Sequence, residues 1–180
     1  MSNKEKTLLI ARTAIFIALL IALQAVTASL GNIVTGPVVN LMLIISVMTC
    51  GLASGLYVAV FSPVIAKFLG IGPLWSLIPF IAVGNMSLVS LWHFIGNRNA
   101  KSKYLAYVAA LVCASVVKFL VLYVGIVRIA VPIILGLPEQ QAAVISVMFS
   151  IPQLINPIVG GVFAIILLPT LKKVIGEIQK

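Results

Sequence analysis

The sequence predicts an all-α fold: a polytopic membrane bundle of six transmembrane helices with both termini in the cytoplasm. Of its 180 residues, 62% are hydrophobic and only 8% are charged, whereas a soluble domain carries about 25% charged residues. Apolar runs of about 20 residues recur along the chain, which is the length a helix needs to cross a hydrocarbon layer about 30 Å thick. The mean hydropathy of +1.26 agrees with this class.

Glycine-containing turns separate the first four predicted spans. The first span follows the polar opening MSNKEK and ends before GNIVTGP, a predicted external loop. The second span is short, and the tight turn GLASG separates it from the third. The fourth begins after GIGP, because proline suits the first turn of a helix. We predict these spans at about residues 8–29, 38–50, 55–69 and 74–95.

The last two predicted spans flank a segment whose structure the sequence does not predict uniquely. The basic loop NRNAKSK precedes the fifth span, at about 104–127. Residues 128–141 contain two prolines and a glycine, so we predict an external loop or a broken helix there. The sixth span, about 145–171, ends at LPTLKK, and two prolines near its beginning leave its start open. We expect residues 1–180 to form a single integral-membrane domain.

The net charge of +9 is unevenly distributed. Nine of the twelve basic residues lie in the N-terminal segment, the loop before the fifth span and the C-terminal tail: Lys4, Lys6, Arg12, Arg98, Lys101, Lys103, Lys172, Lys173 and Lys180. With six spans these segments share one side, and the positive-inside rule makes that side cytoplasmic in a multi-pass protein of the cell membrane. No basic cluster is interleaved with aromatic residues, so we expect the lipid bilayer and no nucleic acid as a partner.

Residues that would carry chemistry are scarce. The chain has no aspartate, and its glutamates, Glu5, Glu139 and Glu177, lie near or outside the predicted membrane boundaries. It has no P-loop motif for ATP hydrolysis, so energy for uphill transport would come from a partner. Cys50 and Cys113 lack Cys-x-x-Cys spacing, and we interpret both as small buried hydrophobic residues. We therefore expect no enzyme, no catalytic residues, no cofactor and no metal.

Small residues line one face of the first predicted helix. Ala14, Ala18 and Ala22 recur at a spacing of four, and such stripes allow another helix to approach closely within lipid. The spacing alone leaves open whether that helix belongs to this chain or to a partner.

Together with the six spans, the Ala-x-x-x-Ala first helix, the Gly-Pro second helix and the GG…LLPTLKK ending resemble the substrate-binding S components of energy-coupling factor (ECF) transporters. The resemblance covers essentially the whole chain. It implies that the protein captures a vitamin or related micronutrient outside the cell. It also implies docking, through Ala14, Ala18 and Ala22, on a T component that is bound to two ATPase subunits. A stand-alone small transporter or channel, or a structural membrane subunit, remains as an alternative.

Lys118 interrupts the apolar run LVCASVVKFLVLYVG. Fourteen residues into its predicted helix, it lies roughly 21 Å along the axis, in the outer half of the layer. Two interpretations stay open: the ammonium binds an anionic ligand, such as a carboxylate or phosphate, or it snorkels to the headgroups. Other outer-half polar residues that could join it in a substrate site are Asn40, Asn85, Gln153 and Asn156. Lys67 and Arg128 would attract such an anion or serve as interfacial anchors.

The two tryptophans are placed near opposite membrane boundaries. An aromatic belt explains both Trp75, at the outer boundary, and Trp92, nearer the inner one. Trp75 has a second interpretation, stacking on a ring of the bound substrate, and is therefore included among the candidate substrate-binding residues.

Overall fold

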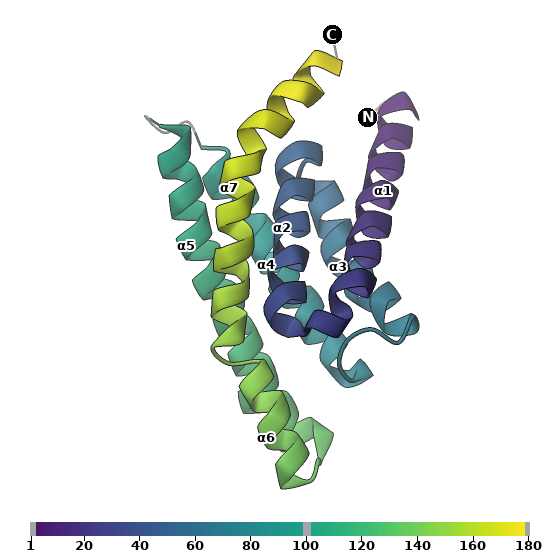
Figure 1. Ribbon diagram of the computed structural model, residues 1–180, viewed down its shortest axis with the longest axis vertical. Coiled ribbons are helices and arrows are strands. Elements are labelled where there is room, and N and C mark those ends of the chain that lie inside the picture. Colours follow the sequence, from purple (N-terminus) through teal and green to yellow (C-terminus); the bar gives the residue numbers. More distant parts are fainter. Residues whose placement is uncertain (1–2, 99–101, 179–180) are drawn as a thin grey trace.

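The computed structural model describes residues 3–98 and 102–178, and throughout these residues the regular structure is helical, with no strand. The predicted all-α bundle is thereby confirmed. Five helices are long and apolar enough to cross a membrane, and the shorter helix over Leu52–Phe68 is apolar as well. The helices pack side by side, and the two described chain ends lie at the same end of the bundle (Figure 1).

The first three helices form a compact group. They are α1 (Asn3–Thr27), α2 (Asn32–Cys50) and α3 (Leu52–Phe68), with the 3-10 turn η1 (Ala28–Leu30) between the first two. The prediction that α2 starts at residue 38 is wrong, because the chain reverses at Gly31, which has a φ of 79°. The backbone N–H groups of Val34 and Thr35 both donate to the Gly31 carbonyl. Pro37 consequently lies within the helix, where it removes one backbone donor.

The fourth and fifth helices are the most closely associated pair in the structure. A short 3-10 turn, η2 (Trp75–Leu77), leads into α4 (Ile78–Gly96), and α5 (Lys103–Leu122) continues without interruption into the π-helix η3 (Tyr123–Leu135). Of the two alternatives predicted for residues 128–141, the broken helix is the one observed: the helix runs on to Leu135, is interrupted at 136–138 and resumes at Glu139. An apolar cluster in which Ile126 and Val131 pack with Leu77 holds this segment on the bundle.

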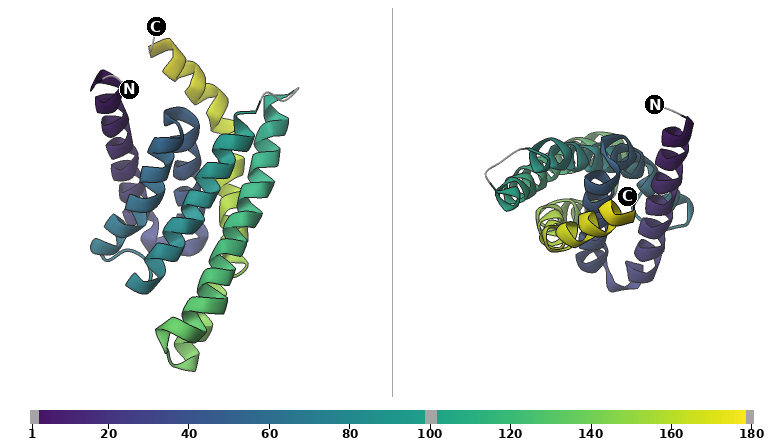
Figure 2. Two further views of the ribbon diagram at one scale, coloured as in Figure 1. Left: turned by 180° about the vertical axis from the view of Figure 1, so that it is seen from behind. Right: turned by 90° about the horizontal axis from the view of Figure 1, so that it is seen from above.

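The chain then reverses at Gly136 into α6 (Glu139–Met148), which packs against η3. The final helix, α7 (Pro152–Ile178), begins at a proline after a short break. The predicted sixth span, starting near 145, thus crosses this break. The hairpin of η3 and α6 extends beyond the other helices, at the end of the bundle away from both termini (Figures 1 and 2).

The core lies between α2, α4, α5 and α7. Trp92 is 0% exposed and packs in this core, so its assignment to an aromatic belt is wrong. Cys113 is exposed and Cys50 is half-buried, which contradicts the expectation that both are buried. Both errors arise because composition does not show which side of a helix faces its neighbours.

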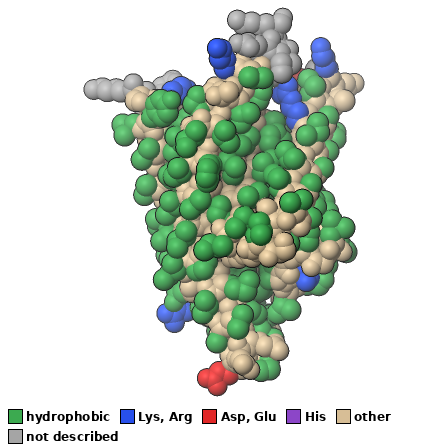
Figure 3. All heavy atoms as spheres, in the orientation of Figure 1, with side chains coloured by type: hydrophobic (Ala, Val, Ile, Leu, Met, Phe, Trp, Pro, Cys, Tyr) green, Lys and Arg blue, Asp and Glu red, His purple; other side chains and the backbone are tan. Residues whose placement is uncertain are grey.

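Hydrophobic side chains cover the flank of the molecule seen in Figure 3, while lysine and arginine side chains lie toward its two ends. Such a surface is the one expected of a bundle that crosses a bilayer. Of the basic residues in the predicted cluster, Lys101 and Lys180 lie outside the described residues.

Candidate functional site

A cavity of about 550 Å³ lies between the helices and is lined by residues of the half of the bundle that is away from the two termini. Its walls come from α1, α2, α3, α4, α5, the α6–α7 junction and the loop at residues 71–74. Two lysines, Lys67 and Lys118, line it, and no aspartate or glutamate is among its described lining residues. Its other polar lining residues are Gln24, Asn32, Thr35, Asn40, Ser62, Asn85, Gln153 and Asn156.

Lys118 is the most deeply buried charged group of this cavity, with only 3% of its surface exposed. Its Nζ donates one hydrogen bond to Asn40 Oδ1 and another to Asn85 Oδ1, each 2.7 Å long. The lysine thus joins α5 to α2 and α4. Snorkelling, which would carry the ammonium to the membrane surface, is not what the structure shows.

Backbone carbonyls fix the direction of both asparagine side chains. Asn40 Nδ2 donates to the Gly36 carbonyl at 2.8 Å, and Asn85 Nδ2 donates to the Ala59 carbonyl at 3.4 Å. The Ala59 carbonyl is available because Pro63, four residues later in α3, has no N–H to offer it. Each carboxamide is therefore held with its oxygen toward Lys118.

Close helix packing sets the position of the α2 side of the site. At Gly160 of α7, an added Cβ would lie 2.5 Å from the Pro37 carbonyl oxygen and 3.0 Å from Asn40 Cβ. A side chain at Gly36 would likewise collide with Asn156. Gly36 and Gly160 let α2 and α7 approach closely enough to bring Asn40 and Asn156 to the same cavity.

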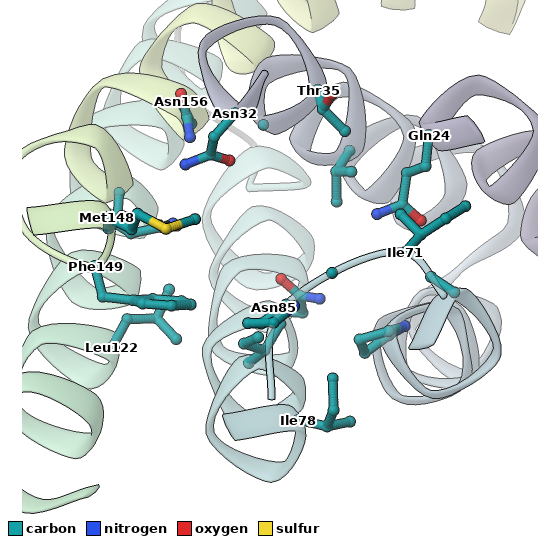
Figure 4. Close-up of a pocket in the computed structure, with 18 of the residues that line it drawn as sticks. Gln24, Asn32, Thr35, Ile71, Ile78, Asn85, Leu122, Met148, Phe149 and Asn156 are labelled. Atoms are coloured by element: carbon teal, nitrogen blue, oxygen red, sulfur yellow. Dashed lines mark hydrogen bonds between the residues drawn. The ribbon is translucent and has the colours of Figure 1, made fainter. Parts of the chain in front are cut away.

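Three buried polar atoms at the cavity have no hydrogen-bond partner among the described residues. They are Asn156 Nδ2, Ser62 Oγ and Gln24 Oε1. Asn156 and Ser62 are each 1% exposed. A buried polar group left without a partner costs about 1–3 kcal/mol, so these atoms favour a polar occupant. Figure 4 shows Asn156 and Gln24 on opposite sides of the cavity.

The predicted substrate-binding residues divide into two groups. Asn40, Asn85, Gln153 and Asn156 line the cavity together with Lys118. Trp75 is not among the lining residues: it is 49% exposed and meets Phe68 edge-on, with 4.8 Å between ring centroids. This position does not support its predicted role at the site.

The two outer basic residues also differ. Lys67, in the last turn of α3, lines the cavity. Arg128 is exposed and lies over the Tyr123 ring, 5.4 Å from its centroid, away from the cavity lining. Sequence reasoning missed four polar lining residues: Gln24, Asn32, Thr35 and Ser62. Gln24 had a usable signal, since it is a lone amide in the first apolar run.

The alanine stripe faces outward from the bundle. Ala14, Ala18 and Ala22 are exposed, whereas Thr13 and Leu20 are the buried residues of α1. Thr13 Oγ1 donates to Ser54 Oγ at 2.9 Å and attaches the opposite face of α1 to α3. The stripe is therefore not a contact with the chain's own helices.

Fold and site together define an all-α membrane protein with a lysine-containing cavity between its helices. Comparison of the chain with protein-family models, curated proteins and solved structures finds no match.

Proposed function

We propose that the protein is the membrane-embedded substrate-binding subunit, or S component, of an ECF-type ATP-driven importer. In this role it captures a vitamin or related micronutrient from outside the cell and delivers it together with a T component and two ATPase subunits. The observation that carries the proposal is the cavity around Lys118. Its buried ammonium is held by two neutral amides, as expected of a site that awaits an anionic solute.

The orientation follows from charge. Lys4, Lys6 and Arg12 belong to α1 and Lys172 and Lys173 to the last turns of α7, at the end that carries both termini. Basic residues favour the cytoplasmic side. Both termini would then be cytoplasmic in the cell membrane, and the cavity would open toward the outside.

The exposed alanine stripe supports a partner in the membrane. Ala14, Ala18 and Ala22 offer a shallow surface along α1, and small residues permit the close helix approach that drives association in lipid. In the proposed complex the T component docks here. The ATPases would supply the energy, since the chain has no P-loop.

The test is co-expression of the tagged protein with an ECF T component and its ATPases, followed by purification and reconstitution in liposomes. We expect a stable complex and solute uptake that requires ATP. Solute movement by the purified chain alone would instead identify a stand-alone transporter or channel. A chain that neither associates with the module nor binds solute would be a structural subunit.

A further inference from the structure

The cavity contains one positive charge that water cannot readily reach. Lys118 has three N–H donors, of which Asn40 and Asn85 accept two. Both acceptors are neutral, so the charge remains uncompensated and one N–H is left for a ligand. Lys67 is only half-buried, and solvent can stabilise it. The cavity thus requires one anionic group on its occupant, placed at Lys118.

The carboxamide side chains of the cavity place a second requirement on its occupant, in addition to the negative charge. Six of them line the cavity: Gln24, Asn32, Asn40, Asn85, Gln153 and Asn156. A carboxamide presents a donor beside an acceptor, which is the pattern that pairs with the edge of a nitrogen heterocycle. Asn156 Nδ2 lacks an acceptor and Gln24 Oε1 lacks a donor, and the two side chains lie on opposite sides of the cavity. The occupant must therefore offer both kinds of group.

The remaining walls are apolar. Leu122, Met148 and Phe149 lie on one side of the cavity, and Ile71 and Ile78 lie on another (Figure 4). Phe149 is buried at 5% exposure, so its ring is a fixed part of the wall. Such walls suit the faces of a flat ring. A sugar presents hydroxyl groups in many directions and matches these walls poorly, while a simple fatty acid leaves the amides without partners.

On these grounds, and resting on the proposed function, we propose that the substrate is a planar nitrogen heterocycle bearing one anionic group. The anionic group accepts the free N–H of Lys118. The ring lies between the apolar walls, and polar atoms on two different edges of it pair with Asn156 and Gln24.

The test is calorimetric titration of the purified full chain in nanodiscs with three sets of probes. The first contains the heterocyclic carboxylates orotate, nicotinate and pterin-6-carboxylate. The second contains their primary amides, and the third contains benzoate and 2-naphthoate. We expect at least one heterocyclic carboxylate to bind about 30-fold more tightly than its amide, as the loss of a charge-assisted hydrogen bond implies. We also expect it to bind about tenfold more tightly than the carbocyclic acids, which leave the amides unpaired.

Single-residue variants test which side chains contact the bound heterocycle. Asn156→Leu and Asn156→Asp should each weaken the bound heterocyclic carboxylate about tenfold or more, because the first removes a hydrogen-bond donor and the second places a carboxylate in the cavity of an anionic ligand. The second change nearly preserves side-chain shape, so it remains informative if the first variant folds poorly. Arg128→Gln removes a cation outside the cavity and is the matched control, with unchanged affinity.

The inference is overturned if no heterocyclic carboxylate binds at about 1 mM, the weak limit of specific binding. Equal affinity for the amide or for the carbocyclic acid also overturns it. Co-purification of the same preparation with the T component is scored separately. A chain that associates but binds another class of solute sinks this inference alone, whereas a chain that does not associate sinks the proposed function.

Discussion

Replacing Lys118 by methionine separates a binding role from a structural one. Methionine keeps the length and flexibility of the side chain while removing its charge. In the native protein the ammonium is 3% exposed and donates to two asparagines. The variant therefore removes the proposed ligand contact and leaves two amide oxygens without their donor.

Two opposing contributions determine the stability of Lys118→Met. Removing a buried charge recovers about 2.5–3.5 kcal/mol on membrane-insertion scales. Leaving Asn40 Oδ1 and Asn85 Oδ1 unpaired costs about 1–3 kcal/mol for each atom. Because these contributions largely offset each other, we expect the variant to insert, fold and purify in the usual yield.

The loss of ligand affinity in Lys118→Met is not offset by any favourable contribution of this kind. A hydrogen bond to a charged group contributes about 1.5–3 kcal/mol, and each 1.4 kcal/mol is about tenfold in affinity. Lys118→Met should therefore weaken a bound heterocyclic carboxylate roughly 10- to 150-fold. Lys118→Arg should also weaken it, because a larger planar guanidinium does not fit between two fixed amide oxygens.

The assay is calorimetric titration of both Lys118 variants, with gel filtration to verify folding and Arg128→Gln as the control that removes a cation elsewhere. Affinity within about twofold of the native protein in well-folded Lys118→Met would refute the reasoning, since a twofold change is about 0.4 kcal/mol. The lysine would then be a structural link between helices and nothing more.

Three further predictions follow from the helix surfaces. Ala18→Phe should abolish association with the T component without altering solute affinity. The control is Leu19→Phe, which changes a residue that is already large and exposed and should leave association intact. Pull-down assays compare the two variants. In a background without native cysteines, Ile33→Cys should react with an impermeant thiol reagent in intact cells and Ser102→Cys should not; the reverse pattern would invert the orientation. Gly160→Val should lower stability by about 1–3 kcal/mol through overpacking against α2, seen as a lower melting temperature, and an unchanged value would contradict the close contact.

Composition and run length were sufficient to predict the all-α bundle, because the bilayer constrains both the length and the apolar character of a span. Helix ends were less predictable. Pro37 and Pro132 look like helix boundaries in the sequence, yet both lie inside helices. Packing of their apolar neighbours against other helices outweighs one missing backbone donor, and a sequence does not reveal that packing.

The sequence predicted only those site residues that are polar within an otherwise apolar run. Lys118, Asn40, Asn85, Gln153 and Asn156 stood out from apolar runs, and all five line one cavity. The sequence left two interpretations of Trp75 open, because an aromatic residue at a membrane boundary has the same sequence context whether it faces a cavity or lipid. Ser62 was missed, since a lone serine in an apolar helix is common and its burial comes from the tertiary fold.

The proline of α3 helps to fix the orientation of one amide at Lys118. Without an N–H at Pro63, the Ala59 carbonyl needs another donor, and Asn85 Nδ2 supplies it. That contact commits the Asn85 oxygen to Lys118, so the asparagine cannot rotate to offer its own N–H to an anion without leaving a buried carbonyl unpaired. Asn40 Nδ2 donates to the Gly36 carbonyl, and this bond likewise leaves the Asn40 oxygen directed toward Lys118. The two amides therefore stabilise the ammonium without neutralising it, and the positive charge remains available for a ligand to neutralise.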